Sequence, residues 1–390
     1  MNYILFDEPQ TREYLLPFTF TRPVSEIRIG IITIQEKWEK ISGEKISVAT
    51  ENYLAKKYPL VISKKEDNIW INGSILPTAE LVKAIKALKK GEGIKSGDTL
   101  IAINTEKEIL KNFSGKIKGN EWKGKPVLKV NRLWDIFSLN GEALELDFNF
   151  LTKGRKSAPV SKTNTLLGNK IFVEKGAKLE CAILNSTTGP IYIGKDAEIM
   201  EGSVIRGPFA LCEEATIKAG AKIYGPTTIG PHSKVGGEVS NSVIFGYSNK
   251  GHDGFMGNSV IGEWCNLGAD TNTSNLKNNY STVSVYDYSS KEMVSTGLTF
   301  CGLMMGDHSK CSINTMFNTG TVVGVCANIF GGDFPPKHIP SFSWGGANGF
   351  TVYELDKAFE TARRVFERRH KRFDNTEKAI LEKVFSSTRE

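Results

Sequence analysis

An apolar residue recurs at every sixth position through the middle of this chain, and that period limits the available folds more than any other feature. Eight consecutive members follow one another without a miss: Ile193, Ile199, Ile205, Leu211, Ile217, Ile223, Ile229 and Val235. The pattern resumes at Ile261 and again from Met305 to Ile329. Six is a multiple of the strand period of two and not of 3.6, so a helix cannot keep these residues on one face. The repeat therefore predicts short strands.

The spacing of six also predicts how the strands are connected. Small residues stand four positions after most members of the repeat, as at Ala197, Ser203 and Ala215. Three short strands per coil, joined at tight corners, would place every sixth residue inside a triangular prism, with small residues and glycines at the corners. Coils stacked about 4.8 Å apart would then bury each other's faces. A β-sandwich with chance spacing is the alternative, and eight positions in phase argue against it.

These repeats resemble those of the left-handed β-helix acyltransferases. The resemblance covers about residues 165–345 and implies a left-handed parallel β-helix, whose crossovers break the usual right-handed rule for parallel strands. Activity does not follow from this fold alone, because sugar acetyltransferases, γ-class carbonic anhydrases and inert scaffolds all use it.

Two polar segments interrupt the repeat between Val243 and Met305. The first spans residues 248–255 and the second spans residues 270–280. Loops on a rigid frame commonly carry function, so we expect the site in these segments. The alternative is that they are solvated loops without a function.

Motifs in and between these segments resemble the acetyltransferase half of the GlmU family, whose members are bifunctional glucosamine-1-phosphate acetyltransferases and N-acetylglucosamine-1-phosphate uridylyltransferases. The matching motifs are Lys250-Gly251-His252, Asn266-Leu267-Gly268-Ala269 and Asn275. The resemblance implies that His252 is the catalytic base, and that Asn266 and Asn275 contact the substrate. It also implies that the backbone N–H near Ala269 faces the thioester carbonyl of acetyl-CoA.

The chemistry of an amino-sugar acceptor agrees with these roles. Its amine is an ammonium ion at pH 7 and must lose a proton before it attacks a thioester, which a histidine with a pKa near 6.5 is suited to accept. A backbone N–H can stabilise the oxyanion, and asparagines can both donate to and accept from sugar hydroxyls. Ser240 stands where the family carries a phosphate-binding lysine, so Lys250 or Lys277 would have to bind the acceptor phosphate. The expected ligands are therefore an amino-sugar phosphate or a nucleotide sugar, together with acyl-CoA.

The N-terminal third lacks the repeat. Strand-like segments at 3–6, 46–49 and 99–102 and a helix-like segment at 79–88 predict an α/β domain over residues 1–130. Segments 16–23, 70–74 and 131–137 resemble a shortened sugar-1-phosphate nucleotidyltransferase domain of the same family, often labelled glucose-1-phosphate thymidylyltransferase.

This domain departs from the family pattern at two functional positions. The glycine-rich phosphate loop is absent, and Ser74 replaces an aspartate of the metal-binding step, so no metal ligand is identified. The resemblance implies UTP or dTTP with Mg²⁺, and Arg12, Arg22 and Arg28 are the candidate phosphate contacts. The alternative is a domain retained for folding or assembly. For the whole chain, the alternative is a non-catalytic β-helix scaffold with a sugar-nucleotide-sensing domain.

The remaining segments are a linker and a helical tail. Residues 131–164 are expected to connect the two domains, and residues 346–390 are expected to be helical because Leu355, Phe359 and Phe366 share one face of a helix. This helix could cap the β-helix, or its arginines could meet the CoA phosphates. The family places its acyl site between neighbouring β-helices, so the resemblance implies a homotrimer.

Composition excludes several other classes of protein. The net charge is +7, and residues 361–390 hold nine basic and five acidic residues, so the rest of the chain is nearly balanced and a nucleic-acid binder is not expected. No signal peptide and no apolar run of about 18 residues is present, so no membrane association is expected. The six cysteines form no CxxC pair, which favours free thiols and a cytoplasmic protein. The five histidines include no close pair at ligand spacing, which argues against a carbonic anhydrase.

Overall fold

The computed structural model describes residues 1–106, 108 and 119–388, and the chain divides into two compact units. The N-terminal unit contains residues 1–27 and 32–132. The second unit contains residues 28–31 and everything from Leu133 onward. A four-residue strap from the N-terminal sequence therefore belongs to the second unit, which the sequence did not indicate.

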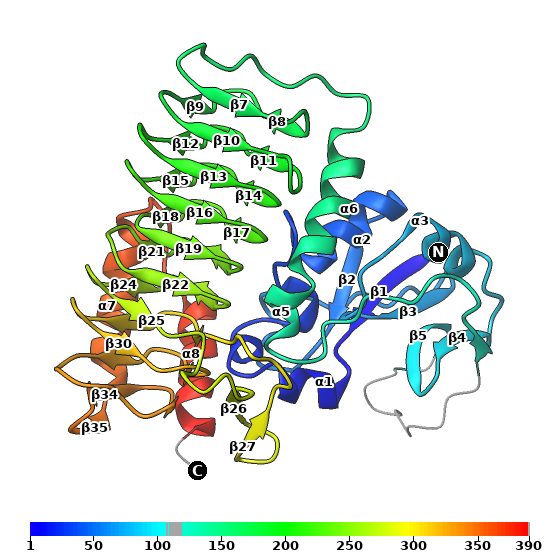
Figure 1. Ribbon diagram of the computed structural model, residues 1–390. Helices are drawn as coiled ribbons and strands as arrows, with labels where there is room; N and C mark the ends of the chain where they lie inside the picture. Colours follow the sequence, from blue (N-terminus) through cyan, green and yellow to red (C-terminus); the bar gives the residue numbers. More distant parts are fainter. Residues whose placement is uncertain (107, 109–118, 389–390) are drawn as a thin grey trace. The chain divides into compact units, whose positions relative to one another are not determined.

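A six-stranded sheet forms the core of the N-terminal unit, with the strand order β2-β1-β3-β5-β4-β6 (Figure 1). Its strands are β1 Asn2–Phe6, β2 Ile46–Ala49, β3 Asn68–Asn72, β4 Gly93–Ser96, β5 Thr99–Asn104 and β6 Asn120–Glu121. Its helices within the described residues are α1 Pro9–Tyr14, α2 Ile34–Ser42 and α3 Ala79–Lys86, with 3₁₀ turns η1 Phe18–Phe20 and η2 Val24–Glu26. Strand β1 pairs in parallel with β2 and β3, while β5 is antiparallel to β3. The α/β class predicted for this part is confirmed.

Three parallel sheets form the faces of a β-helix in the second unit, because every third strand along the chain joins the same sheet. The eight-stranded sheet contains β7 Thr165–Leu167, β10 Ile183–Asn185, β13 Val204–Arg206, β16 Lys222–Tyr224, β19 Glu238–Ser240, β22 Phe255–Gly257, β25 Asn272–Thr273 and β30 Met316–Phe317. The nine-stranded sheet contains β8 Ile171–Val173, β11 Ile191–Ile193, β14 Phe209–Leu211, β17 Thr227–Ile229, β20 Val243–Gly246, β23 Val260–Glu263, β28 Met304–Met305, β31 Val322–Val323 and β33 His338–Ile339. The ten-stranded sheet contains β9 Lys178–Leu179, β12 Glu198–Ile199, β15 Thr216–Ile217, β18 Lys234–Val235, β21 Asn249–Lys250, β24 Asn266–Leu267, β29 Lys310–Cys311, β32 Asn328–Ile329, β34 Ser343–Gly346 and the antiparallel β35 Gly349–Val352.

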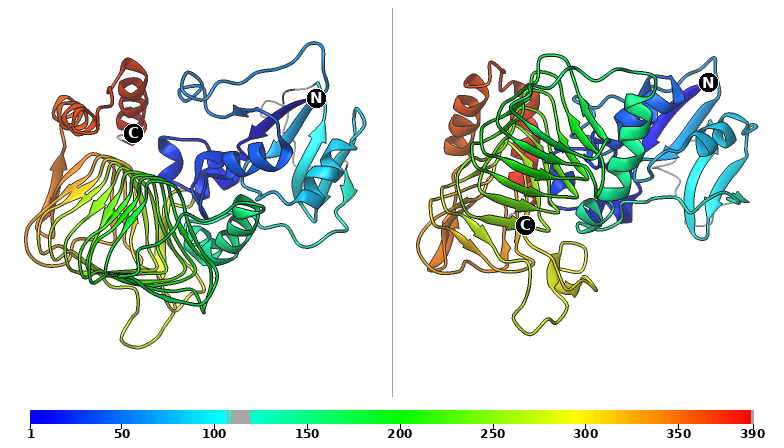
Figure 2. Two further views of the ribbon diagram at one scale, coloured as in Figure 1. Left: turned by 90° about the horizontal axis from the view of Figure 1, so that it is seen from above. Right: turned by 45° about the horizontal axis from the view of Figure 1, so that its top comes forward.

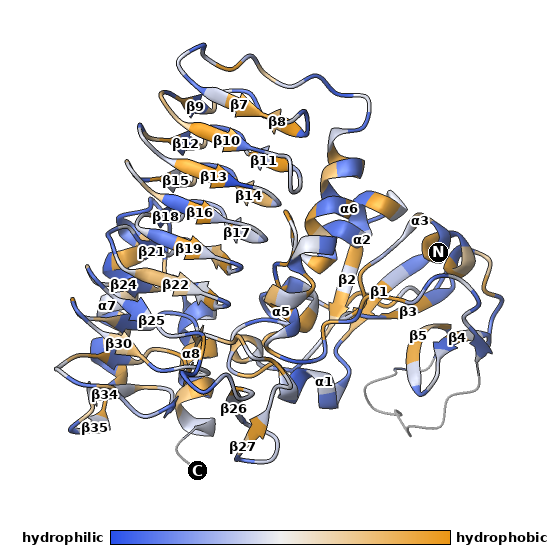
Figure 3. Cartoon of the chain, in the orientation of Figure 1, coloured by the Kyte–Doolittle hydropathy of each residue, from blue (hydrophilic) through white to orange (hydrophobic). Residues whose placement is uncertain are grey.

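The interior of the β-helix is built from the sixfold repeat. All eight residues from Ile193 to Val235 in the repeat are 0–2% exposed and belong to one continuous apolar cluster. Seen along the stack, the coils overlie one another in a triangular outline (Figure 2), and the apolar colour concentrates on their strands (Figure 3). The predicted hexapeptide-repeat β-helix is confirmed.

The expected interruptions differ from the structure. Residues 248–255 do not leave the coil, because they supply β21, a short turn and the start of β22. Residues 272–273 are likewise a strand of the coil, and the chain departs only afterwards to form a hairpin of β26 Ser284–Asp287 and β27 Glu292–Ser295. The repeat therefore runs through the first polar segment, with Lys250 in place of an apolar residue.

Helices surround the β-helix on the outside. Residues 131–164, which we expected to be a linker, include α5 Asp135–Ser138 and α6 Asn140–Thr152. The tail forms two helices, α7 Leu355–Glu367 and α8 Asn375–Ser387, in place of a single one. Within the described parts of the chain, no helix combines the length and apolarity that crossing a membrane requires.

Candidate active site

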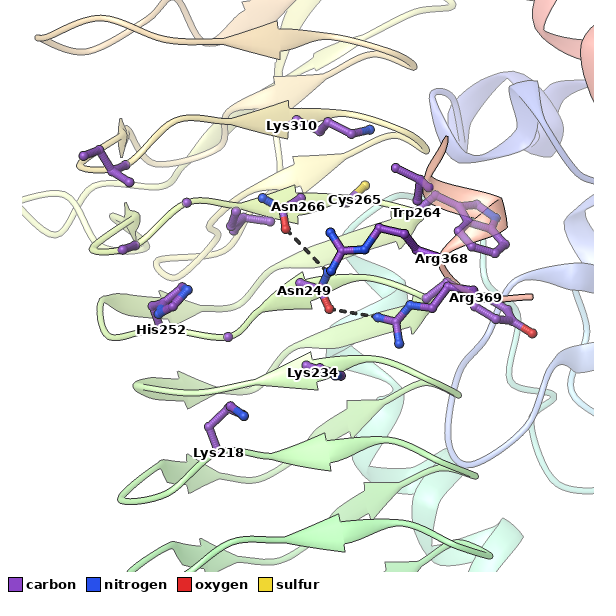
Figure 4. A pocket seen from close by; sticks show the side chains of 17 residues that line it. Lys218, Lys234, Asn249, His252, Trp264, Cys265, Asn266, Lys310, Arg368 and Arg369 are labelled. Atoms are coloured by element: carbon purple, nitrogen blue, oxygen red, sulfur yellow. Dashed lines mark hydrogen bonds between the residues drawn. The ribbon is translucent and has the colours of Figure 1, made fainter. Parts of the chain in front are cut away.

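A cavity of about 660 Å³ lies on the outer face of the ten-stranded sheet, beside the end of α7 (Figure 4). Its floor is one outward-facing column of the sheet, in which the pairing of β18, β21, β24 and β29 aligns Lys234, Asn249, Asn266 and Lys310. His252 lies at one end of this floor, just beyond β21. The β-helix register thus brings together residues that are far apart in the sequence.

Positive charge dominates the walls of the cavity. The cations that line it are Lys218, Lys234, Lys310, Arg368 and Arg369, and none of the described lining residues is an aspartate or glutamate. Arg369 donates to Asn249 Oδ1 at 3.1 Å, and Asn249 Nδ2 lies 3.5 Å from Asn266 Oδ1 (Figure 4). Burial and the neighbouring Arg368 both lower the pKa of Arg369, as expected where like charges share a half-buried space. Such a site favours a ligand with several negative charges.

A ladder of stacked aromatic rings fixes α7 beside the cavity. His232, Tyr247, Trp264 and His308 occupy successive corner positions of the coils, each with a positive φ of 55–62°. The rings of Tyr247 and Trp264 are 4.2 Å apart, and Phe366 of α7 stacks on Trp264 at 4.0 Å. Phe366 lies just before Arg368 and Arg369, so this stacking determines where the two guanidinium groups can reach.

The imidazole of His252 is exposed at the edge of the cavity. Among the residues that the structure describes, none forms a hydrogen bond with it. His252 also lines a second hollow of about 320 Å³, which contains Asp253 and Asp270. The imidazole therefore borders two hollows, one lined by cations and one containing carboxylates, and it can contact a ligand from either side.

The structure brings together three of the residues predicted from the sequence and separates two others. His252, Asn266 and Ala269 line the same cavity. Asn275 does not line it and donates to Asn258 Oδ1 at 2.9 Å, beside β22 of the eight-stranded sheet. Lys250 does not fit the predicted contact with a substrate phosphate, because its side chain points into the β-helix and is 2% exposed.

Several lining residues were not predicted from the sequence. Asn249, Lys218, Lys234 and Lys310 lie on the outward side of the ten-stranded sheet, directly next to an interior member of the repeat. Assigning each strand to one of three faces would have collected them on one surface. Arg368 and Arg369 carry no such signal, because the packing of α7 alone decides which of the tail's arginines reach the cavity.

The three arginines predicted to bind nucleotide phosphates are buried or bonded to other protein groups. Arg12 is buried and donates to Asp7 Oδ2 at 3.0 Å, to Tyr53 Oη at 2.9 Å and to the carbonyl of Thr19. Arg22 is also buried. Arg28 belongs to the second unit, where it donates to the carbonyl of Phe245 at 3.0 Å. These positions do not match the predicted phosphate contacts, since the surrounding protein encloses or engages each side chain.

A polar cluster occupies the end of β1 in the N-terminal unit. Glu8 Oε2 accepts from Lys129 Nζ at 2.5 Å and from Thr11 Oγ1 at 2.6 Å. Burial would raise the pKa of Glu8, but the hydrogen bonds and the charge of Lys129 outweigh it, and the pKa is lowered. Ser74, at the position of the missing metal aspartate, donates to Asn72 Oδ1 at 2.6 Å.

Magnesium, which the family resemblance implies, needs carboxylate oxygens that are free to bind it. Asp7 and Glu8 at the end of β1 are instead paired with Arg12 and Lys129. Within the described ranges, no three histidine, cysteine, aspartate or glutamate side chains group together as metal ligands. The residues present therefore do not fit a resident magnesium ion.

Comparison with known proteins gives one family match and several bifunctional relatives. Residues 3–156 match the family model described as sugar nucleotidyl transferase. The bifunctional sugar-1-phosphate nucleotidylyltransferase/acetyltransferase of Sulfurisphaera tokodaii is 28% identical over 168 residues, which are 43% of this chain and 41% of that protein. The bifunctional protein GlmU of Methanocaldococcus jannaschii is 28% identical over 233 residues, which are 58% of this chain and 50% of that protein.

The chain spans about half the length of these relatives or less. The match of residues 3–156 reaches beyond the N-terminal unit and includes α5 and α6 of the second unit. The resemblance predicted from the motifs is therefore confirmed by sequence similarity: residues 3–156 match a sugar nucleotidyl transferase family model, and the chain is similar to GlmU-like bifunctional nucleotidyltransferases/acetyltransferases.

Proposed function

We propose that the β-helix unit transfers an acetyl group from acetyl-CoA to the amine of an amino-sugar phosphate or a nucleotide sugar. The observation that carries this proposal is the open imidazole of His252 at the edge of a cavity lined by five cations. In this proposal His252 removes a proton from the acceptor amine, which then attacks the thioester carbonyl. The C–N bond forms, the C–S bond breaks and the thiol of CoA leaves with a proton.

The charges of the cavity agree with ligands of this kind. Both acetyl-CoA and a sugar phosphate or nucleotide sugar carry phosphate groups, and guanidinium groups bind phosphates through paired N–H donors. Arg368 and Arg369 supply such donors from α7, and Lys218, Lys234 and Lys310 supply point charges from the β-helix. These residues take the place of Lys250 in the proposal, since the Lys250 ammonium lies inside the coil.

Neutral groups of the cavity would orient the acceptor sugar and the thioester carbonyl of acetyl-CoA. Asn249 and Asn266 can both donate to and accept from sugar hydroxyls. A backbone N–H near Ala269, which lines the cavity, would stabilise the oxyanion. We further propose a homotrimer, in which Asn275 would reach a ligand held by a neighbouring copy. A monomer in light scattering would contradict that part of the proposal.

For the N-terminal unit we propose recognition of UTP, dTTP or a nucleotide sugar, with nucleotidyl transfer as the activity that its sequence family suggests. Any magnesium ion would arrive with the nucleotide phosphates, because Asp7 and Glu8 are already paired with cations. The same pairing favours a second candidate function, a sensing domain that binds a sugar nucleotide without turnover. Pyrophosphate release from UTP or dTTP with a hexose 1-phosphate separates the two, since the sensing domain would bind without releasing it.

The acetyl transfer is tested by mass spectrometry of the products formed from acetyl-CoA and glucosamine 1-phosphate or an amino-sugar nucleotide. The variant His252→Gln should lower the rate by roughly 10²–10⁴-fold if His252 is the general base. His370→Gln is the matched control, because His370 is also exposed and follows α7 outside the cavity. Equal rates for the two variants would remove His252 from the mechanism. No acetylated product with any acceptor would favour the non-catalytic scaffold.

A further inference from the structure

A lysine occupies an interior position of the sixfold repeat beside the candidate base. Counting from β20, the inward residues of successive strands are Ile244, Lys250, Met256 and Ile261. The side chain of Lys250 is among the largest of the fully buried ones, although the inward residues of the neighbouring strands are apolar. A buried charge is costly unless partners compensate for it.

Three backbone carbonyls surround the ammonium group. Nζ of Lys250 donates to the carbonyl of His252 at 2.8 Å, to that of Gly236 at 3.0 Å and to that of Asp253 at 3.3 Å. An ammonium has three N–H donors, so these contacts use all of them. Two of the three acceptors lie in the turn that carries His252, and the third lies on the preceding coil.

The neighbouring coil leaves room for this group. Gly237 has a φ of +70°, and a Cβ atom there would lie 2.9 Å from Nζ of Lys250 and 2.7 Å from the carbonyl oxygen of Gly254. A side chain at residue 237 would therefore push against both the ammonium and the turn. The interior lysine, the glycine and the turn form one packed arrangement.

We propose that Lys250 is a positioning residue, whose buried ammonium holds the turn of residues 251–254 and thereby keeps the imidazole of His252 oriented toward the acceptor amine. The proposal deepens the acetyl-transfer function proposed above and rests on it for its kinetic consequences. Its physical basis is that a catalytic group displaced by about 1 Å loses much of its effect, on the order of 10²-fold.

The charge of Lys250 is set by burial and by three neighbours. Burial lowers its pKa to about 8, while Asp253 and Asp270 act in the opposite direction. Cys311 also faces it, but burial raises the pKa of that thiol, which therefore stays neutral near pH 7. The ammonium is thus mostly protonated at pH 7 and loses its charge above about pH 8. A neutral amine has two N–H donors for the three carbonyls, so the turn should loosen as the pH rises.

Stability and activity should respond differently when this lysine is replaced. The variant Lys250→Met removes the cost of burying a charge, but it leaves three carbonyls without their donor. Because these two effects oppose each other, the melting temperature should change little while acetyl transfer is lost. A residue that merely filled the core would not lower acetyl transfer at a nearly constant melting temperature.

The experiment compares kcat and KM of acetyl transfer over about pH 6.5–9.5 for the wild type, Lys250→Met and Lys250→Gln. We expect kcat of Lys250→Met to fall about 10-fold to 100-fold, with little change in the KM of the acceptor. The wild type should lose kcat above about pH 8, and both variants should lack this decline because neither side chain titrates. Lys250→Gln keeps a neutral donor, so it should retain more activity than Lys250→Met. An unchanged kcat in Lys250→Met, or a decline above pH 8 that persists in both variants, would overturn the proposal.

Lys37→Met is the matched control, because Lys37 is another buried lysine whose ammonium donates to a backbone carbonyl, that of Ile32, in the N-terminal unit. It should leave acetyl transfer and its pH profile unchanged. If Lys250→Met does not fold, Lys250→Gln carries the comparison.

A readout without catalysis keeps the two proposals distinguishable. Endoproteinase Asp-N cuts before aspartate, so the rate of cleavage between His252 and Asp253, followed by mass spectrometry, reports how firmly the turn is held. We expect this bond to be cut several-fold faster in Lys250→Met than in the wild type or Lys37→Met. Faster cleavage without acetyl transfer by any protein would reject the function and retain the positioning role. Equal cleavage would reject the positioning role.

Discussion

Arg369 links the C-terminal helix to the floor of the cavity through Asn249, 3.1 Å away. Because its guanidinium is half-buried among other cations, we expect it to bind a ligand phosphate. The variant Arg369→Gln should raise the KM of acetyl-CoA or of the acceptor about tenfold and make that KM less sensitive to salt. Initial-rate kinetics at two ionic strengths measure both effects. Arg363→Gln is the control, since Arg363 lies on the same helix but pairs with Glu367 at 3.0 Å. Similar KM values for the two variants would contradict the assignment.

Glu8 and Lys129 form an ion pair whose effect depends on pH. The pKa of Glu8 is lowered in the folded protein, so the pair stabilises the fold above the ordinary glutamate pKa, and this contribution disappears as the pH falls through the lowered value. We expect Lys129→Met to reduce the free energy of unfolding by about 1–3 kcal/mol at pH 7. The deficit should shrink below about pH 4. Chemical unfolding at both pH values tests this, and a deficit that does not change with pH would contradict it.

At the scale of secondary-structure elements, Phe366 fixes the position of α7 against the β-helix. It is buried and stacks on Trp264 at 4.0 Å, at the corner ladder of the β-helix. Phe366→Ala should cost about 3–5 kcal/mol of the free energy of unfolding. It should also weaken binding of acetyl-CoA, because Arg368 and Arg369 would lose their fixed position. Calorimetry of unfolding and of ligand binding measures the two effects. Unchanged binding in a destabilised variant would show that the arginines do not need the stacked helix.

The elements differ in how far the sequence predicted them. The coils were predictable because the period of six is a direct consequence of three short strands per turn. Lys250 also occupies a position of this repeat, six residues after Ile244 and six before Met256. The prediction of a loop at residues 248–255 is wrong, because a polar segment can stay within the coil when its polar side chains point outward or find partners inside. Helix α6 was missed because its apolar and polar residues do not separate into two clear faces.

At the scale of the molecule, the site could be predicted only in part. His252, Asn266 and Ala269 were predicted because their spacing resembles a family motif; the structure places them on one cavity, and their roles stay predictions. The cations of the cavity come from four separate segments, and only the parallel register and the packing of α7 bring them together. The predicted phosphate contact of Arg12 does not match the structure for a related reason. Nothing in the sequence around Arg12 shows that Asp7 and Tyr53 enclose its guanidinium.

The strap of residues 28–31 should stabilise the second unit, to which it belongs. Asn140 is fully buried, and its Oδ1 accepts from the backbone N–H of Gly30 at 2.7 Å and from Thr228 Oγ1 at 3.2 Å. Asn140→Ala would leave the Gly30 N–H without its acceptor, at a cost of about 1–3 kcal/mol in the free energy of unfolding, while Thr228 Oγ1 would keep the Gly30 carbonyl at 2.8 Å. Thermal unfolding should show the loss in the transition of the β-helix. Asn185→Ala on the eight-stranded sheet is the control, and an equal effect of both variants would contradict a special role of the strap.

The same strap bears on how the chain matures on the ribosome. Arg28 is synthesised 217 residues before Phe245, whose carbonyl it binds, and Gly30 is synthesised 110 residues before Asn140. Because synthesis runs from the N-terminal to the C-terminal side, the strap leaves the ribosome long before the coils of the second unit exist. The strap can form its contacts with Phe245 and Asn140 only after these residues have been synthesised. The second unit therefore cannot complete its folding from the residues after 133 alone. A nascent chain released early would lack the coils that the strap joins, and a chain begun late would lack the strap.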